Sequence, residues 1–215
     1  MPSEPIPQSA AEFAAVVAAR LCHDFLSPAS AIVSGLDLLD DPQAQDMRSD
    51  ALGLIAESAR KLVDLLAFYR IAFGASAAAQ AFSTSELGGL TRAVFTHAKA
   101  ELDWSPSLEA LPKPAARVLL NLTQMAGAAL PMGGLVRVRA DVLSGVLTIA
   151  VEATGPKTRL REEVSEGLNL KALGEGMSGP WAQATYAALV AAEAGGRIVV
   201  EAAPERITFG AALPS

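Results

Sequence analysis

His23 is the residue of this chain with the clearest capacity for chemistry, because Asp24 follows it directly. A carboxylate beside an imidazole can orient the ring and keep one ring nitrogen nucleophilic. Pro28 lies five residues further on, and a proline inside a helix removes a backbone hydrogen bond at a cost of about 3 kcal/mol. A useful bend beside the histidine would account for that cost. We therefore expect His23 to act as a nucleophile assisted by Asp24; an ordinary exposed histidine is the competing interpretation.

The remaining composition argues against several other kinds of site. Cys22 is the only cysteine, so an intramolecular disulfide and a multi-cysteine metal site are excluded. Two histidines among scattered carboxylates form no ligand cluster, and we expect no bound metal. The net charge is −6 without a dense Lys/Arg cluster, which argues against nucleic acid as a partner. We see no signal peptide, and the apolar stretches are broken well short of a membrane span, so we expect a cytoplasmic protein.

Two long helices should carry and present His23. Ser9 and Glu12 form a capping-box pattern, and the first helix should end near Leu39, before Pro42. A second helix is expected from about Asp46 to Phe73, so that residues 9–74 form an antiparallel hairpin. Each helix has an apolar stripe at helical spacing, which predicts a four-helix bundle in a homodimer. The stripes consist of Phe13, Val17, Leu21, Pro28, Ile32, Leu36 and Leu39, and of Leu52, Ile55, Leu62, Leu65, Leu66 and Tyr69.

His23 lies roughly 150° around the first helix from its apolar stripe, and should therefore face solvent. The neighbouring positions hold small residues and two exposed aliphatics, which suits the close approach of another protein. The docking residues that we predict are Leu26, Ser27, Ser30 and Val33.

The second half of the chain has a different character. After a small-residue linker, Gly74 to Ala81, helical segments alternate with short β-rich segments. The strand pairs expected at 135–142 with 146–152, and at 197–201 with 206–211, have the pattern of hairpins. Helices are expected near 85–100, 114–130 and 181–194, with a strand at 102–104 and a polar, irregular stretch up to Gly179. Residues 82–215 should therefore form an α/β sandwich, and the whole chain belongs to the α+β class.

The segment from His23 to Pro28 resembles the H-[ED]-x-x-x-P phosphoacceptor box of two-component histidine kinases. In that family the box lies on the first helix of a dimerisation and phosphotransfer hairpin. Residues 117–122 with 129–138, and residues 186–201 with 207–214, are similar to parts of the family's ATP-binding domain. The resemblance covers about residues 9–213.

Departures from the family pattern fall on the elements that bind the nucleotide. Asn121 is kept, but Met125 replaces the second asparagine, and a thioether is a poor ligand for magnesium. Ala153 stands where the family has the aspartate that recognises adenine, and Lys157 replaces a glycine of the same box. Residues 176–181 lack the glycine-rich pattern expected before the last helix. The three departures together predict a domain that does not bind ATP.

The chain is similar to the histidine phosphotransferases of the ChpT type in alphaproteobacteria, most closely over residues 19–39 and 70–76. The resemblance implies that His23 takes a phosphoryl group from the receiver-domain aspartate of a hybrid histidine kinase. Arg20 and Lys61 could then pair with the phosphoryl group, although ordinary surface charges on a helix would look the same. His23 then passes the group to response regulators, CtrA-like and CpdR-like, in a cell-cycle phosphorelay. The chain would bind no cofactor, since the partner's receiver domain supplies the magnesium. An active ATP-dependent histidine kinase and a non-catalytic dimeric adaptor that binds response regulators are the alternatives.

Overall fold

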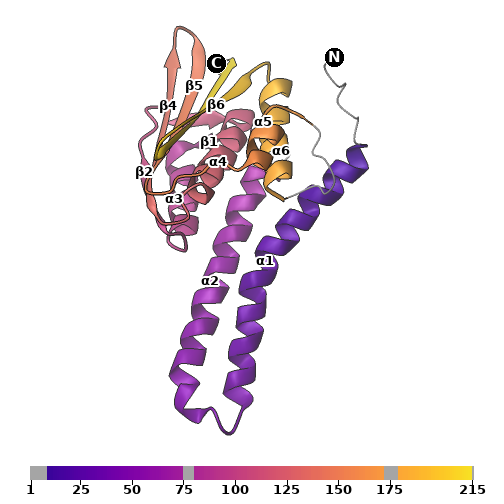
Figure 1. Cartoon of the computed structure of the whole chain (residues 1–215), viewed down its shortest axis with the longest axis vertical. Helices are drawn as coiled ribbons and strands as arrows, with labels where there is room; N and C mark the ends of the chain where they lie inside the picture. Colours follow the sequence, from indigo (N-terminus) through magenta and orange to yellow (C-terminus); the bar gives the residue numbers. More distant parts are fainter. Residues whose placement is uncertain (1–8, 75–79, 172–178, 215) are drawn as a thin grey trace.

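A long helical hairpin forms the N-terminal part of the protein (Figure 1). The computed structural model describes residues 9–74, 80–171 and 179–214. Helix α1 runs over Ala10–Asp40 and helix α2 over Arg48–Ala72, and the turn between them includes the 3-10 helix η1, Gln45–Met47. Ser9 caps α1 in a capping box with Glu12, as predicted. The expected antiparallel hairpin is confirmed.

The two helices approach each other closely at Gly35. A Cβ at this position would lie 2.6 Å from Ile55 Cγ1 and 3.2 Å from the carbonyl oxygen of Ala51. Towards its N-terminus α1 diverges from α2 and packs against α6 (Gly179–Glu193), where the rings of Phe13 and Trp181 are 6.2 Å apart. Alpha-helix α1 is long and apolar enough, by length and composition alone, to span a membrane. It also contacts α2 and α6.

A five-stranded sheet forms the centre of the second part. Its strand order is β2-β4-β5-β7-β6, with β2 parallel to β4 and the other neighbours antiparallel. The strands are β2 (Ala100–Trp104), β4 (Gly134–Leu143), β5 (Val146–Thr154), β6 (Arg197–Ala203) and β7 (Arg206–Pro214). Strands β1 (Ala81–Ser83) and β3 (Ala110–Pro112) form a small separate sheet that the sequence analysis did not predict.

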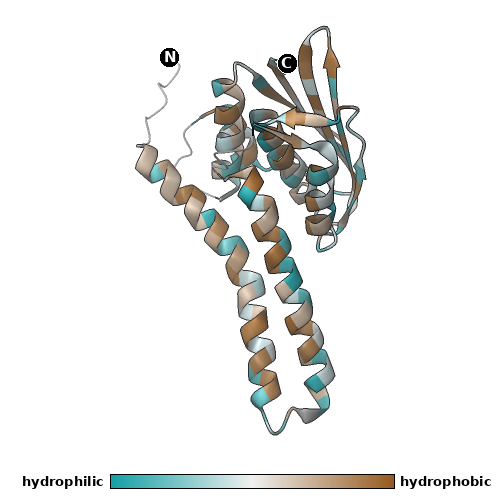
Figure 2. Cartoon of the chain, turned by 180° about the vertical axis from the view of Figure 1, so that it is seen from behind, coloured by the Kyte–Doolittle hydropathy of each residue, from teal (hydrophilic) through white to brown (hydrophobic). Residues whose placement is uncertain are grey.

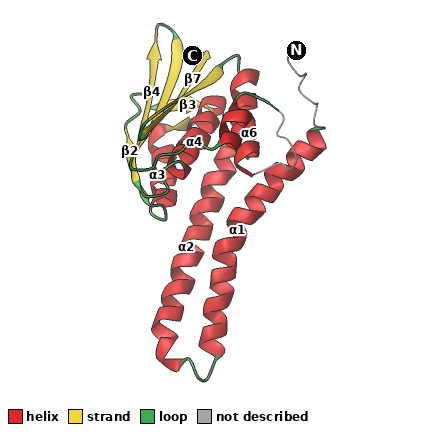
Figure 3. Ribbon diagram, in the orientation of Figure 1, coloured by secondary structure: helices red, strands yellow, loops and turns green. Residues whose placement is uncertain are grey.

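Helices cover one face of the large sheet (Figure 3). They are α3 (Thr84–Phe95), α4 (Lys113–Ala128), α5 (Glu162–Leu168) and α6. Along β4, β5 and β7 every second side chain is a buried apolar one, as expected for a sheet with one covered face. The predicted α/β sandwich is therefore present. Helix α5 was not predicted, because the polar stretch up to Gly179 was expected to be irregular; residues 172–178 of that stretch, and 75–79 of the expected linker, lie outside the described residues.

Candidate functional site

His23 projects from the outer face of α1, and its side chain is 85% exposed. Its Nδ1 atom lies 3.2 Å from Oδ1 of Asp24, whose side chain is only 18% exposed. An ionised carboxylate can only accept hydrogen bonds, so this contact selects the tautomer with the proton on Nδ1. The Nε2 atom then keeps its lone pair and remains open to a reacting partner.

Two further groups hold Asp24 from the side opposite His23. Oδ2 of Asp24 accepts hydrogen bonds from Nε of Arg20 at 2.8 Å and from the hydroxyl of Tyr69 at 2.6 Å. Arg20 is one helical turn before Asp24, whereas Tyr69 reaches it from α2 across the hairpin. Burial, and then the negative charge of Asp24, raises the pKa of Tyr69 far above its ordinary value. The hydroxyl therefore stays protonated and serves as a permanent donor.

Tyr69 is a site residue that the sequence analysis placed only in an apolar stripe. It belongs to that stripe by spacing, and its ring does contact Phe25 at a centroid distance of 5.7 Å. Its hydroxyl, however, contacts a carboxylate 45 positions earlier in the chain. A buried tyrosine hydroxyl usually has a hydrogen-bond partner, but the sequence alone did not identify that partner as Asp24.

A groove of ≈ 410 Å³ opens beside His23, between the hairpin and the second domain. The hairpin contributes Arg20, His23, Asp24, Ser27, Lys61 and Tyr69 to its lining. The opposite wall comes from the end of α3, the following loop and α4, including His97 and Gln124. His97 is paired there with Asp64 of α2 at 3.0 Å. The predicted phosphoryl contacts Arg20 and Lys61 are thus on the same groove as the imidazole.

The four predicted docking residues are all exposed on α1. Ser27 and Ser30 accompany His23, while Leu26 and Val33 lie further round the helix and are 61% and 56% exposed. Such large exposed aliphatic side chains, repeated along one helix, are typical of surfaces that another molecule covers. Which molecule covers them is considered with the proposed function.

The residues at the expected nucleotide site do not fit a magnesium–nucleotide complex. Asn121 is fully buried, and its amide group donates to the backbone oxygens of Ala72 and Arg117 at 3.1 and 2.9 Å. Met125 and Ala153 are buried in the apolar core, where neither offers an oxygen ligand nor a hydrogen-bond acceptor for adenine. Residues 176–178 of the expected glycine-rich loop lie outside the described residues. Among the described residues, no group of three His, Cys, Asp or Glu side chains could hold a metal ion.

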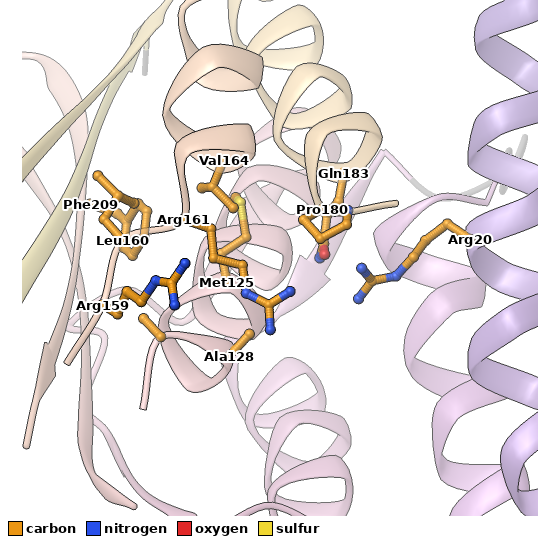
Figure 4. A pocket seen from close by; sticks show the side chains of 11 residues that line it. Arg20, Met125, Ala128, Arg159, Leu160, Arg161, Val164, Pro180, Gln183 and Phe209 are labelled. Atoms are coloured by element: carbon orange, nitrogen blue, oxygen red, sulfur yellow. The ribbon is translucent and has the colours of Figure 1, made fainter. Parts of the chain in front are cut away.

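A second, smaller cavity of ≈ 110 Å³ lies next to this region and has a cationic rim (Figure 4). Arg159 and Arg161 precede α5, and Arg20 reaches the same cavity from α1 on the opposite side. Pro180 and Gln183 of α6 lie between these two sides. Within residues 9–74, 80–171 and 179–214, neither Arg159 nor Arg161 forms an ion pair. Although the whole chain is acidic, three arginines line this cavity, and Arg20 also lines the groove of His23.

Comparison with known proteins places this architecture in one family. Residues 84–206 match the family model described as the histidine phosphotransferase C-terminal domain. The protein phosphotransferase ChpT of Brucella abortus is 33% identical over 210 residues, which covers 97% of this chain and 99% of that protein. A solved bacterial phosphotransferase is 32% identical with a TM-score of 0.86, over 97% of this chain and 100% of that chain.

The second domain also shares its fold with histidine kinases. The catalytic domain of the histidine kinase ThkA has a TM-score of 0.50 at 18% identity, over 62% of this chain and 93% of that chain. The likeness supports the α/β sandwich and not the kinase activity, since identity is low and the nucleotide-binding side chains differ. From the family match over most of the second domain, and from the relative that covers nearly the whole chain, this chain belongs to the histidine phosphotransferases.

Proposed function

We propose that His23 is the phosphoacceptor of this phosphotransferase. It takes a phosphoryl group from the receiver-domain aspartate of a hybrid histidine kinase and passes it to the aspartate of response regulators. The observation that carries the proposal is the imidazole itself, exposed on a groove with Nδ1 against Asp24 and Nε2 open. His97, the other histidine, is largely buried and already paired with Asp64.

The geometry at His23 and Asp24 supports a direct transfer between nitrogen and oxygen. The Nε2 lone pair attacks the phosphorus of the aspartyl phosphate, the Nε2–P bond forms, and the P–O bond to the receiver aspartate breaks to leave a carboxylate. The ring would then carry positive charge, which Asp24 offsets by holding or accepting the Nδ1 proton. The reverse sequence delivers the group to the next receiver. Asp24 thus takes part in both directions.

Positive side chains around the groove suit the charge of the transferred group and of its carrier. Arg20 and Lys61 line the groove and can offset phosphoryl charge. A receiver domain that binds magnesium must present carboxylates, and Arg20, Arg159 and Arg161 form a rim of opposite charge. We propose that the partner supplies the magnesium and that this chain binds no metal, nucleotide or other cofactor.

An unpartnered apolar face on the hairpin supports a homodimer as the working form. Apolar residues that are exposed or half-buried alternate in steps of four and three along both helices, the spacing of a coiled-coil seam. We call this set the apolar seam; it consists of Cys22, Leu26, Ala29, Val33 and Leu36 on α1, and Leu52, Ala56, Ala59, Val63 and Leu66 on α2. Brown patches of high hydropathy follow both helices in Figure 2.

Helical geometry puts both halves of the apolar seam on one side of the hairpin. On each helix, the seam residues lie about 100–120° around the helix axis from the residues that contact the other helix. Viewed from the N-terminus of each helix, this rotation has the same direction in both. Because the helices are antiparallel, that direction brings both halves to the same side, and His23 to the other. A second copy could therefore close a four-helix bundle while both imidazoles stay accessible. Leu26, at the border nearest His23, could contact the receiver as well.

The wider setting is the one that the sequence resemblance implies, and it is part of the proposal. We propose a cytoplasmic relay without nucleic-acid or membrane partners, serving CtrA-like and CpdR-like regulators of the cell cycle. The packing of α1 against α2 and α6 supports a soluble chain. The buried Met125 and Ala153 argue against the alternative of an ATP-dependent kinase.

The decisive experiment mixes the protein with magnesium and a purified receiver domain that carries labelled aspartyl phosphate. We expect alkali-stable, acid-labile label on the protein, its loss in His23→Gln, and no label from ATP alone. Label from ATP alone would favour the kinase alternative. Absence of label on the unaltered protein, with binding to the receiver retained, would favour the adaptor instead.

A further inference from the structure

A line of polar side chains runs through the junction between the hairpin and the second domain. Gln183 on α6 donates through Nε2 to Oε1 of Gln124 on α4, at 2.6 Å. Gln124 donates through Nε2 to the hydroxyl oxygen of Tyr69, again at 2.6 Å. Tyr69 in turn donates to Oδ2 of Asp24. The line therefore connects α6 with the carboxylate beside His23.

All three hydrogen bonds point in the same direction, towards Asp24. A hydroxyl has one proton, and because Gln124 donates to the Tyr69 oxygen, that proton is directed at the carboxylate. Hydrogen bonds to a charged acceptor are stronger than neutral ones, and aligned bonds polarise one another. The array leaves Oδ2 occupied by Tyr69 and Arg20, so that Oδ1 faces His23.

The contrast in burial explains why such an array is needed. His23 is almost fully exposed, and Asp24 is its hydrogen-bond partner among the described residues. Tyr69 and Gln183, in contrast, are buried. The exposed imidazole of His23 can rotate freely unless Asp24, the group that it contacts, is itself fixed. Asp24 is the next residue on the same helix, so its backbone position alone does not fix the carboxylate. Support for Asp24 comes from Arg20 on the same helix and, from the buried interior, from Tyr69.

From these contacts we propose that Tyr69, with Gln124 and Gln183 behind it, positions the Asp24 carboxylate so that it orients His23 for phosphoryl transfer. The inference rests on the proposed role of His23 and deepens it. It also gives the second domain a part in the chemistry. Besides Gln124, the amide of Gln183 also donates to Oδ1 of the buried Asn121, at 3.2 Å. Residues near the expected nucleotide site therefore support the phosphoacceptor histidine and not a nucleotide.

The first test measures single-turnover transfer from a phosphorylated receiver domain at varied receiver concentration. Tyr69→Phe removes only the hydroxyl, and we expect the maximal rate to fall about tenfold, by analogy with the groups that orient metal-bound histidines. The half-saturating receiver concentration should not change, because Tyr69 is only 4% exposed although it lines the groove. Tyr186→Phe is the matched control: its hydroxyl is also partly buried, and among the described residues its hydrogen bond goes to the Phe73 carbonyl, at 3.5 Å.

The second test observes the imidazole directly. In ¹⁵N spectra of the neutral ring, the unaltered protein should show His23 mainly with the proton on Nδ1, and Tyr69→Phe should show both tautomers. A merely structural role for Tyr69 would leave that ratio unchanged. Gln124→Met should shift the rate and the ratio in the same direction by a smaller amount, and it decides the matter if Tyr69→Phe does not fold.

The outcomes separate this inference from the proposed function. If the unaltered protein accepts no phosphate on His23, the proposed function fails. If it accepts phosphate, but Tyr69→Phe and Gln124→Met match Tyr186→Phe in rate and tautomer ratio, the positioning role alone is overturned. A raised half-saturating concentration at an unchanged maximal rate would also overturn it, since Tyr69 would then act in docking.

Discussion

At the scale of single residues, the site depends on the two oxygens of the Asp24 carboxylate, which have different partners. Oδ2 of Asp24 is engaged by Arg20 and Tyr69, and Oδ1 faces His23. Because both oxygens of this carboxylate have partners, the contacts of Oδ2 with Arg20 and Tyr69 fix the position of Oδ1 against His23. The imidazole is thus free to meet solvent and partner, while its orientation is set in the protein interior.

Tyr69 should leave a signature in the pH dependence of stability. Burial and the charge of Asp24 raise its folded-state pKa above the ordinary value of about 10. The folded protein then holds the phenolic proton more tightly than the unfolded chain, so this stabilisation is complete below about pH 10 and is lost as pH rises towards the folded-state pKa. The difference in unfolding free energy between the unaltered protein and Tyr69→Phe should fall above pH 10, by up to about 1.4 kcal/mol per pH unit.

Urea unfolding of both proteins between about pH 8 and pH 11 measures this difference, given the alkaline pKa of a free phenol. Groups other than Tyr69 titrate alike in the two proteins and cancel. A difference that stays constant up to pH 11 would mean that the phenol does not hold its proton in the folded state.

At the scale of elements, the sequence predicted what depends on local pattern and missed what depends on packing. The spacing of α1 placed His23 outward, and the capping box at Ser9 placed the start of the helix. Helix α5 was missed because seven residues give too little periodicity. The contact of Gln124 with Gln183 joins positions 59 apart in sequence, and only the packing of α4 against α6 brings them together.

The apolar seam gives the clearest prediction at this scale. Leu66→Glu combined with Val63→Glu places two charges on a surface that the proposed dimer would bury, and unpaired buried charges cost several kcal/mol. We expect the dimer to dissociate at micromolar concentration, while each hairpin keeps its own helix contacts. Light scattering should then report a mass near the 22.2 kDa of one chain in place of twice that value.

Val199→Glu provides a control for this change, because Val199 on β6 is 54% exposed, close to the 63% of Val63, but lies outside the apolar seam. It should leave the mass unchanged. A dimer that survives the double substitution would show that the two copies meet elsewhere, and the apolar seam would then be free for receiver domains.

At the scale of the whole molecule, charge is distributed unevenly. The chain has a net charge of −6, yet Arg20, Arg159 and Arg161 converge beside the groove. The open face of the sheet has arginines too, but Arg137 and Arg139 are paired there with Asp103 and Glu152. Arg20 is paired with Asp24, but Arg159 and Arg161 form no ion pair among the described residues. Such cations orient an approaching acidic partner, while the acidic remainder of the surface repels it.

This asymmetry predicts that the rate of phosphoryl transfer falls with salt concentration, and that Arg159 and Arg161 account for most of the fall. Raising ionic strength shortens the range of exposed charges to a few ångströms, so the second-order rate of transfer from an acidic receiver should fall roughly tenfold between about 0.05 and 0.5 M salt. The double variant Arg159→Gln, Arg161→Gln should transfer more slowly than the unaltered protein at low salt. At high salt the transfer rates of the two proteins should become equal. Arg137→Gln with Arg139→Gln removes the same charge from the far face and should retain the original rate and salt slope. Equal effects of the two double variants would assign the attraction to net charge, and the rim beside His23 would lose its role in steering.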